Sequence, residues 1–559
     1  MNIDRRRALA LLGLGAAAPA SGALAQGAYE GAVAFEHGVA SGDPLPNAMI
    51  LWTRITPKAE TSAPIAYTWR INPVDRRAGG AKSGSGVTGP DRDYTVKIDV
   101  TGLDPDRAYT YEFEANGVTS AMGRTRTPSV GETREVVLAV ASCSLYPNGY
   151  FNAYQAIADL PKVDAVVHLG DYIYEYGGEG SYGMTSAVAG ERPHDPPHEI
   201  VSLSDYRTRH AQYKSDPALQ AAHARAPWIV AWDDHETANN SWFGGAENHQ
   251  PETEGDWNAR KAAALKAYFE WMPIRDPGPG GAFEAMNRTF HFGDLVSLIM
   301  LETRLTARDE QLDYAHDLPV VDGKPDVAAF MKKLHDPSRR MMSEAQEAWF
   351  AKEVTDSVKA GRTWQVLGNQ VVMARVDVPS PRKVLGEEAV AAAIATQPED
   401  IAKRIDQMER LAGMGLPYGL DMWDGYPAAR ERLYDAVAAA GAKAVVISGD
   451  SHAFWANELY DDQGALRAVE FGTTGITSPG AGDYVKGLPV GELYMKGAKE
   501  IVFSDHDAKG FVLLTLTPDE VKGELRTVSS IVSKDYETGV RAAFTATPGE
   551  GGVSGLTKI

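Results

Sequence analysis

The chain has almost no cysteine: Cys143 is the one thiol in 559 residues. A single cysteine excludes an intrachain disulfide, so disulfides cannot hold this fold together. Basic residues are also in deficit, and the formal net charge is −20. A strongly acidic protein repels polyanions, which argues against nucleic acid as a substrate or stable partner. On composition alone, Cys143 would be a small buried apolar residue.

Long hydrophobic runs are missing as well. The N-terminal stretch after Arg5–Arg7 is rich in Ala and Gly, and it is too weakly apolar to favour a membrane span. It ends in the small-x-small sequence Ala23–Ala25. This pattern predicts a signal peptide over residues 1–25, with arginines typical of the twin-arginine kind. We therefore expect export by the twin-arginine machinery to the periplasm or the medium, and no membrane span after processing.

The chain after residue 25 begins with the alternating apolar and polar pattern that is typical of β-strands. Apolar and polar residues alternate in Ile65–Ile71 and through Tyr94–Gly117, where turn residues separate two strand-like runs. A Leu-Asp-Pro-x-x-x-Tyr-x-Tyr pattern runs from Leu103 to Tyr111 and is typical of a tyrosine at a strand corner of a small sandwich. We expect an all-β sandwich domain, of the fibronectin III-like kind, over residues 26–129.

From residue 130 onward, short apolar runs alternate with helical stretches. The expected strands are Val136–Val140, Ala165–Leu169, Trp228–Trp232, Leu295–Leu301, Trp364–Leu367 and Ala444–Ile447. The expected helices are Asn258–Trp271, Ser343–Lys359 and Ala428–Ala440, with Gly441 as the cap of the last. This alternation predicts an α/β layered domain over residues 130–559. Two irregular stretches, about 177–199 and 376–397, are expected to lie above the sheet near a substrate.

Ligand-type side chains follow each of the six apolar runs. They are Cys143; Asp171, Tyr174 and Glu175; Asp233, Asp234 and His235; Glu302 and Arg304; Asn369; and Asp450 and His452. Each alone has an ordinary explanation as a helix cap, a turn former or an ion-pair partner. Because sites in layered α/β sheets form where strands end, these side chains would meet at one edge of one sheet. So many like charges need cations, which predicts a centre of two or more metal ions with Cys143 as a thiolate ligand.

The ordered motifs resemble those of the PhoD-like alkaline phosphatases and phosphodiesterases, in the metallophosphoesterase superfamily. The matching segments are FEHGVASGDPLPNAMILWTRITP (Phe35–Pro57), ASCS, HLGDYIYE, WDDHETANN, LETR, VLGNQ, DMWDGYPAARERL (Asp421–Leu433) and SGDSHAFW (Ser448–Trp455). The resemblance implies a β-sandwich ahead of a four-layer αββα catalytic domain. It also implies a ferric ion, Fe(3+), with Ca(2+) nearby. Zinc is the less favoured alternative, since it also accepts Cys, His and Asp.

The resemblance implies a role for each matching residue. The metal ligands that it implies are Cys143, Asp171, Tyr174 and His452 for iron, with Asp171 as the bridge, and Asp234, Asp450 and Asn239 for calcium. His235 resembles a histidine that contacts phosphate or protonates the leaving group. Arg304 and Asn369 are candidates for contacts with phosphate or with the ligands. This sequence departs from the family pattern at Glu302, because family members often have Asp before Thr-Arg.

We therefore expect an exported, metal-dependent phosphatase that acts on small phosphate esters. It would hydrolyse monoesters, and diesters too, with water or hydroxide that the metal activates. A phospholipase D-type phosphodiesterase is an open alternative, because the same centre serves diesters if the pocket admits a second substituent. A non-catalytic secreted binding protein is the alternative from a different class.

Overall fold

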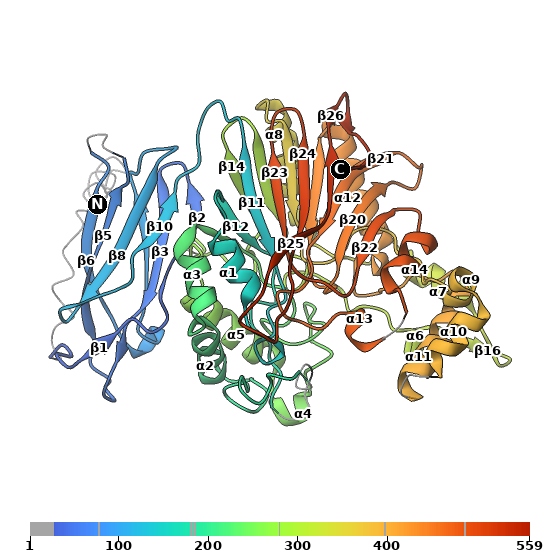
Figure 1. Cartoon of the computed structure of the whole chain (residues 1–559), viewed down its shortest axis with the longest axis horizontal. Coiled ribbons are helices and arrows are strands. Elements are labelled where there is room, and N and C mark those ends of the chain that lie inside the picture. The colour runs from blue at the N-terminus through green and yellow to red at the C-terminus, as the bar shows by residue number, and fades with distance from the viewer. Residues whose placement is uncertain are drawn as a thin grey trace, which may run out of the picture.

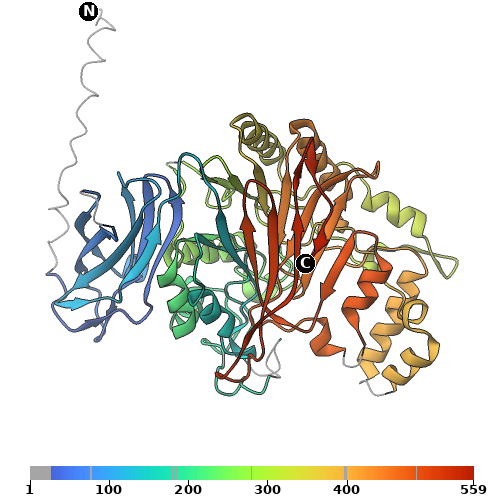
Figure 2. The same ribbon diagram turned by 45° about the horizontal axis from the view of Figure 1, so that its top comes forward.

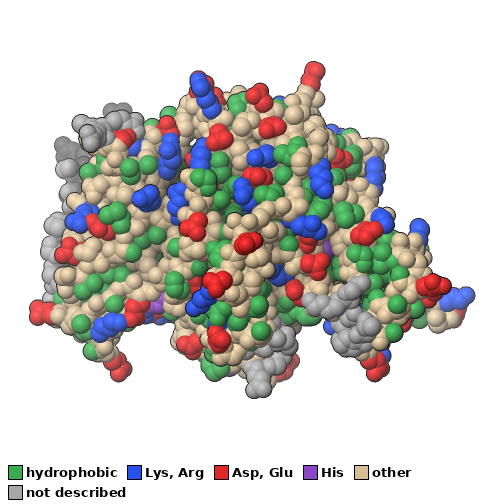
Figure 3. All heavy atoms as spheres, viewed as in Figure 1, with side chains coloured by type: hydrophobic (Ala, Val, Ile, Leu, Met, Phe, Trp, Pro, Cys, Tyr) green, Lys and Arg blue, Asp and Glu red, His purple; other side chains and the backbone are tan. Residues whose placement is uncertain are grey.

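The computed structural model describes residues 27–75, 79–178, 182, 186–278, 280–395, 399–485 and 488–559. The predicted signal peptide, residues 1–25, lies outside the described residues. Within them, every helix is too short or too polar to cross a bilayer. On the face drawn in Figure 3, Lys and Arg side chains lie among Asp and Glu and form no continuous basic patch.

The N-terminal region is rich in β-strands, as the alternation predicts. One sheet runs in the order β10-β8-β5-β6, with β9 on β8. Its strands are β5 (Ile65–Pro73), β6 (Lys82–Thr88), β8 (Ala108–Ala115), β9 (Val118–Thr119) and β10 (Gly123–Arg126). At the expected corner, the Asp104 N–H donates to the hydroxyl of Tyr109 over 2.9 Å. This hydrogen bond gives the buried Tyr109 hydroxyl a partner.

Three other N-terminal strands continue the largest sheet that the structure describes. That sheet has the order β28-β25-β24-β23-β11-β12-β13-β2-β3-β7. Its strands are β2 (Val39–Leu45), β3 (Ala48–Arg54), β7 (Thr95–Thr101), β11 (Val136–Ala141), β12 (Ala165–His168), β13 (Trp228–Val230), β23 (Lys509–Leu516), β24 (Val521–Val528), β25 (Thr538–Ala546) and β28 (Thr557–Lys558). β13 joins β2 in parallel, with Trp228 opposite Gly42. The β-rich end and the α/β region therefore share one sheet.

A seven-stranded sheet is the second large sheet. Its order is β14-β15-β18-β19-β21-β20-β22. Its strands are β14 (Arg288–Phe292), β15 (Val296–Met300), β18 (Trp364–Gly368), β19 (Ala444–Ser448), β20 (Phe454–Tyr460), β21 (Leu466–Gly472) and β22 (Ile501–Asp505). Val445 and Ile447 share one apolar cluster with Val140 of the ten-stranded sheet. Val446, between them, packs on the opposite face with Leu433 of α12, because successive side chains of a strand alternate.

Helices cover these sheets and agree closely with the sequence. Their bounds are α1 (Asn152–Ala158), α2 (Leu203–Lys214), α3 (Pro217–Arg225), α5 (Trp257–Trp271), α8 (Glu344–Lys359) and α12 (Pro427–Ala440). Ser343 caps α8 by accepting the Gln346 N–H, and Gly441 ends α12 with φ 64°. Helices α8 and α12 pack on the outer face of the seven-stranded sheet. The predicted α/β class with a β-rich N-terminal region is confirmed.

The second stretch expected to be irregular contains helices instead. They are α9 (Pro381–Leu385) and α10 (Glu387–Ile394), followed by α11 (Glu399–Ala412). The run EEAVAAAI has strong helix propensity and explains α10. With α14 (Val490–Gly497), these helices lie at the end of the molecule opposite the N-terminal strands (Figures 1 and 2). The first stretch, about 177–199, holds no helix or strand in its described part, as expected.

Parallel pairing brings the strand ends together. β11, β12 and β13 are parallel neighbours. β15, β18, β19 and β21 are parallel neighbours in the other sheet. A single bridge between Ser142 and Gly475 links the loops that leave β11 and β21. The carboxyl ends of both sets of strands therefore face a common region.

Candidate metal centre

The loops at the strand ends hold several candidate ligands in left-handed backbone conformations. Cys143, Asp171, Asp450 and His452 have φ angles of 61°, 55°, 62° and 55°. For residues other than glycine this region costs about 1–2 kcal/mol each. Hydrogen bonds between the loops hold this backbone conformation in place. In one of them the Cys143 N–H donates to the Gly170 carbonyl at 3.2 Å. Such strain collected at one place is typical of a functional site.

Two features bring the β12 and β13 loops into contact. Gly170 has φ +111°, and a Cβ there would lie 2.3 Å from the Asp233 nitrogen, so only glycine fits. The buried Glu236 carboxylate accepts the N–H groups of Asp171, Tyr172 and Asp233 at 2.6–3.0 Å. Glu236 thus fixes the positions of the Asp171 and Asp233 loops relative to each other.

One end of the site combines a thiol with a carboxylate, a phenol and an imidazole. Cys143, Asp171 and His452 each offer a ligand atom within 4.8 Å of the others. The Tyr174 hydroxyl lies 3.1 Å from Asp171 Oδ2 and 3.2 Å from His452 Nε2. Burial, followed by the Asp171 charge, raises the pKa of the Cys143 thiol well above its ordinary value. A cation bound to the sulfur would stabilise the thiolate and so lower this pKa.

The His452 ring is oriented as a metal-ligating imidazole usually is. Its Nδ1 lies 2.9 Å from the Pro479 carbonyl, which can only accept, so Nδ1 carries the proton and donates. That leaves Nε2 as the atom with a free lone pair, facing Tyr174. Burial lowers the pKa of His452 to about 3, so the ring is neutral. A backbone carbonyl on the far nitrogen is the common way to fix a ligand histidine.

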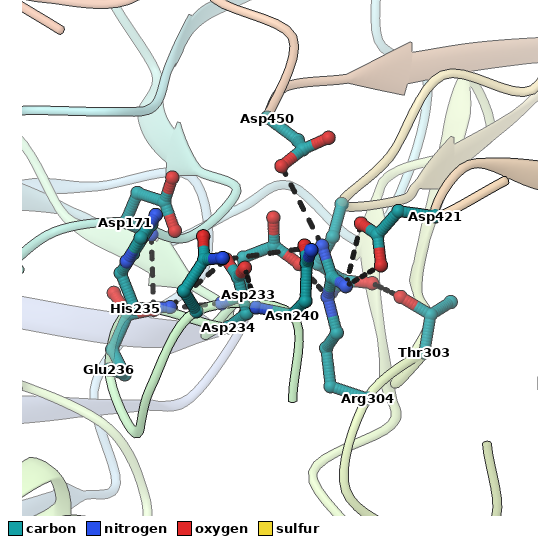
Figure 4. A network of polar contacts seen from close by, with 12 residues as sticks. Asp171, Asp233, Asp234, His235, Glu236, Asn240, Thr303, Arg304, Asp421 and Asp450 are labelled. Atoms are coloured by element: carbon teal, nitrogen blue, oxygen red, sulfur yellow. Dashed lines mark hydrogen bonds and ion pairs between the residues drawn. The ribbon is translucent and has the colours of Figure 1, made fainter. Parts of the chain in front are cut away.

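Four aspartates form a carboxylate row beside this end. Asp171, Asp233, Asp234 and Asp450 place ligand oxygens within 4.8 Å of one another. Figure 4 shows them converging, with Asp171 at one end and Arg304 between Asp450 and Asp421 at the other. Asp171 Oδ1 and Asp233 Oδ2 are buried and have no hydrogen-bond partner among the described residues. Buried carboxylate oxygens without partners are a costly arrangement that bound cations would satisfy.

Among the described residues, the four carboxylates of the row outnumber the two cationic groups beside them, the Arg304 guanidinium and the His235 ring. Burial and neighbouring carboxylates raise the pKa of Asp171 and Asp233 well above the ordinary range, although Arg304 opposes this at Asp233. Burial raises the pKa of Asp450 to about 7, although its side chain keeps 22% of its surface exposed. For Asp234, burial is outweighed by His235 and Arg304, which lower its pKa. The residue types and these unmet charges fit a pair or cluster of cations.

The stability of the metal-free protein should therefore fall as the pH rises. A carboxyl whose pKa is higher in the folded protein than in the unfolded chain stabilises the fold while it is protonated. This contribution is complete below the pKa of the unfolded chain, about 3.9. It is lost as the pH rises through the pKa of the folded protein. For Asp450 the folded value is about 7. We expect the Tm of chelator-treated protein to fall by several degrees between about pH 4 and pH 7–8. Metal-loaded protein, scanned in parallel, should keep its Tm; coincident curves would contradict the cation site.

His235 lies where it can exchange a proton. Its Nδ1 is 2.7 Å from Glu175 Oε2, and Glu175 is itself held by the Asn239 N–H and the Asn248 side chain. This bond leaves Nε2 available to a ligand. Burial lowers the pKa of His235, but Asp234, Glu175 and Asp171 outweigh it and raise the pKa well above its ordinary value. A protonated imidazole oriented by a carboxylate suits a general acid.

Arg304 is enclosed by carboxylates. The fully buried guanidinium pairs with Asp233 at 2.5 Å and Asp421 at 2.9 Å, and its Nη2 lies 3.6 Å from Asp450. Glu302 shapes the loop that carries it, because its carboxylate accepts the N–H groups of Arg304, Leu305 and Thr306. The longer Glu302 side chain thus has a local role in holding Arg304.

The side chains of two predicted residues have partners outside the carboxylate row. The Asn369 side chain donates to the Val371 carbonyl and accepts the Trp423 ring N–H at 3.0 Å. The Asn239 side chain donates to Glu247 at 3.1 Å. Neither makes a side-chain hydrogen bond to the four aspartates within the described part of the chain. The neighbouring Asn240 does contact the row, since its N–H donates to Asp234 Oδ2 at 2.6 Å.

The sequence motifs assign no individual role to several residues of this region. They are Asp233, Glu236, Asp421, Tyr182 and Ser478. The motifs WDDHE and DMWDG contain the first three, but the motifs do not reveal which carboxylate pairs with Arg304. Tyr182 reaches His452 Nδ1 at 3.1 Å from the 177–199 stretch, and the Ser478 hydroxyl lies 2.6 Å from that of Tyr174. Both contacts depend on loop conformations that no local pattern predicts.

Comparison with known proteins gives matches along nearly the whole chain. Residues 138–525 match the family description "PhoD-like phosphatase", and residues 19–129 match "PhoD-like phosphatase, N-terminal domain". The chain is 32% identical over 526 residues to alkaline phosphatase D of Bacillus subtilis (strain 168), covering 91% of this chain and 80% of that protein. A solved structure described as "Structure of PhoD" is similar with 30% identity and a TM-score of 0.76. That match covers 94% of this chain and 92% of the other.

Proposed function

Because this chain belongs to the PhoD-like phosphatase family, we propose that its carboxylate row and the adjoining thiol hold the metal ions of a phosphatase that cleaves monoesters and diesters. The predicted resemblance is confirmed, and the chain is a phosphatase. The observation that carries the proposal is the convergence of Cys143, four aspartates and His452 from strands of two sheets. Two buried carboxylate oxygens without partners support it further.

We assign iron to the thiol end of the site. Cys143, Asp171, Tyr174 and His452 offer sulfur, oxygen and nitrogen donors within a few ångströms. A phenolate suits a trivalent ion, while the oxygen-only set of Asp234 and Asp450 suits calcium. Asp171 belongs to all three candidate groups of ligands, which supports it as the bridge. Asn239 would approach the calcium side only if it released Glu247.

Bound cations would supply charge neutralisation at the phosphate and an acidified water as the nucleophile. The chain's own residues do the rest. Arg304 keeps Asp233 and Asp450 in position through its ion pairs. His235, oriented by Glu175, donates its Nε2 proton to the leaving oxygen as the P–O bond breaks. Asn369 supports the loop after β18 through its bonds to Val371 and Trp423.

Turnover of matched esters tests the activity. We expect the metal-loaded protein to release 4-nitrophenol from both 4-nitrophenyl phosphate and bis(4-nitrophenyl) phosphate. Turnover of the diester alone would favour a phosphodiesterase of the phospholipase D type. Absence of turnover with iron and calcium fully loaded would favour the non-catalytic binding protein and would overturn the proposal.

Export is also part of the proposal. The arginines and the cleavage pattern of residues 1–25 support a twin-arginine signal and a periplasmic or secreted enzyme. We propose that the β-rich region ends near residue 129, where the N-terminal family match also ends. The shared ten-stranded sheet makes this a boundary between regions that fold against each other.

The colour of the protein should separate iron from zinc. A phenolate bound to Fe(3+) gives a charge-transfer band in the visible range, so purified protein should be coloured. Tyr174→Phe should lose that band, because the Tyr174 hydroxyl lies beside both Asp171 Oδ2 and His452 Nε2. A colourless wild-type protein that contains zinc would contradict the iron assignment, and an unchanged band in the variant would remove Tyr174 from the ligands.

A further inference from the structure

A deep hollow opens directly beside the carboxylate row. Its volume is about 510 Å³, which is within the usual range for small-molecule sites. Asp421, Asp450 and His452 line one side of it, so it is continuous with the proposed metal centre. The opposite walls come from α9, α11 and α14 at the far end of the molecule (Figure 1).

The interior of this hollow is apolar and aromatic. Trp455, Tyr494 and Leu493 form part of its lining and are at most 2% exposed. The Trp455 ring is held in place by its N–H bond to the Ser451 hydroxyl at 2.8 Å. Toward the solvent, Tyr484 is 44% exposed. Burying an apolar group against such walls is favourable, because it removes apolar surface from water.

One polar side chain stands out among these walls. His506 is 3% exposed and lines the hollow, yet neither of its ring nitrogens has a hydrogen-bond partner among the described residues. Its ring is packed at 5.0 Å on Tyr494 and 5.1 Å from Trp455, so its orientation is fixed. Burial lowers the pKa of His506 to about 4, so the ring is neutral, with one N–H donor and one acceptor nitrogen. A buried imidazole without partners indicates a ligand atom that is meant to meet it.

The hollow does not include the proposed general acid, although it reaches the Asp171 end of the site through His452. His235 is not among its lining residues. In Figure 4, His235 lies at the Asp171 end of the row, and Asp421 lies at the opposite end. A phosphate centred on the row would thus direct its leaving group toward His235. The hollow is then placed for the substituent that stays on the phosphorus.

We propose that this hollow is the subsite for the retained organic group of a phosphodiester, and that the group is an apolar ring or short chain carrying one hydrogen-bonding atom for His506. The inference rests on the proposed phosphatase function. In the reaction, water supplies the incoming oxygen, the bond from phosphorus to the leaving oxygen breaks, and the apolar ester bond stays intact. The enzyme accordingly discriminates among diesters by the group that it does not release.

Diesters that share a leaving group test this directly. Methyl, benzyl and 4-hydroxybenzyl 4-nitrophenyl phosphates all release 4-nitrophenol, so they differ only in the retained group. Wild-type kcat/KM should be at least about tenfold higher for benzyl than for methyl. Met408→Trp fills the hollow from α11 and should abolish that preference, so that kcat/KM for the benzyl ester falls to that for the methyl ester. The matched control Gln407→Trp, on the exposed side of α11, should keep the preference.

A second variant tests the imidazole. His506→Phe keeps a packed ring but has no ring nitrogen. It should therefore lower the ratio of kcat/KM for the 4-hydroxybenzyl ester to kcat/KM for the benzyl ester by about tenfold. Equal kcat/KM for methyl and benzyl in the wild type, or a benzyl preference that survives in Met408→Trp, would overturn the inference and leave the phosphatase function standing. Failure of the metal-loaded wild type to hydrolyse any ester, 4-nitrophenyl phosphate included, would instead overturn the proposed function itself.

Discussion

Cys143→Ser is expected to deplete the protein of iron and to lower phosphatase kcat by roughly 100-fold or more. Loss of a residue that only supports a ligand typically costs about 10–100-fold in metal affinity or activity, so loss of a ligand should cost at least as much. The sulfur lies within 4.8 Å of ligand atoms on Asp171 and His452. Serine is close in size to cysteine, so the change removes the soft donor with little effect on packing. Elemental analysis and steady-state kinetics on the same sample measure both effects.

Ser142→Ala is the matched control for this variant. It removes the hydroxyl that lies 3.1 Å from the Cys143 sulfur but no proposed ligand, so iron should stay bound. Calcium content should change less than iron content in Cys143→Ser, because the calcium side is made of carboxylates. Full iron occupancy in Cys143→Ser would remove the thiol from the ligand set, and the buried cysteine would then be a packing residue.

His235→Ala is expected to lower kcat while both metals remain. For an alkyl leaving group the loss should be about 10²–10⁴-fold, the usual contribution of a general acid. For 4-nitrophenol the loss should be much smaller, because this weakly basic leaving group needs little protonation. The contrast between the two leaving groups is the signature of a proton donor, and kcat for matched alkyl and 4-nitrophenyl esters measures it.

Glu175→Gln should give a smaller loss with the same dependence on the leaving group. The Glu175 carboxylate orients the His235 ring, with Oε2 2.7 Å from Nδ1. Burial lowers the pKa of His235, and the charges of its neighbours, Glu175 among them, outweigh that effect and raise it. The exposed His316→Ala is the neutral control. Metal lost together with activity in His235→Ala would make His235 a ligand, and an equal loss for both leaving groups would exclude a proton-donor role.

The strand-end positions could be predicted because they follow from local patterns. Apolar runs mark β11, β12, β13, β15, β18 and β19 to within two residues. Parallel strands share an edge within each sheet, and the two sheets pack against each other, so the polar residues after these runs fall near one another. Cys143, Asp171, Asp234, Asp450 and His452 are all brought together in this way. The period of the strands and the residue that ends each one predict these positions within each sheet. The expectation of a single shared edge is wrong, because the strands belong to two sheets.

The pairing of side chains within the site could not be predicted in the same way. Asn369 follows a strand like the others, but its amide turns to Val371 and Trp423. Asp233 and Asp234 are neighbours in sequence, yet Arg304 bonds to one at 2.5 Å and only approaches the other, at 3.9 Å. These choices are set by contacts between distant loops. The apolar hollow was equally hidden, because its walls combine α9, in a stretch whose sequence suggested irregular structure, with α11 and α14, which lie beyond that stretch.

Anomalous X-ray diffraction at the iron edge, on crystals of the purified protein, tests the central claim most directly. The account predicts an iron peak within bonding distance of the Cys143 sulfur, an Asp171 oxygen, the Tyr174 oxygen and His452 Nε2, with further cation density between Asp171, Asp234 and Asp450. Absence of a peak among these side chains, or a metal bound elsewhere on the chain, would contradict it.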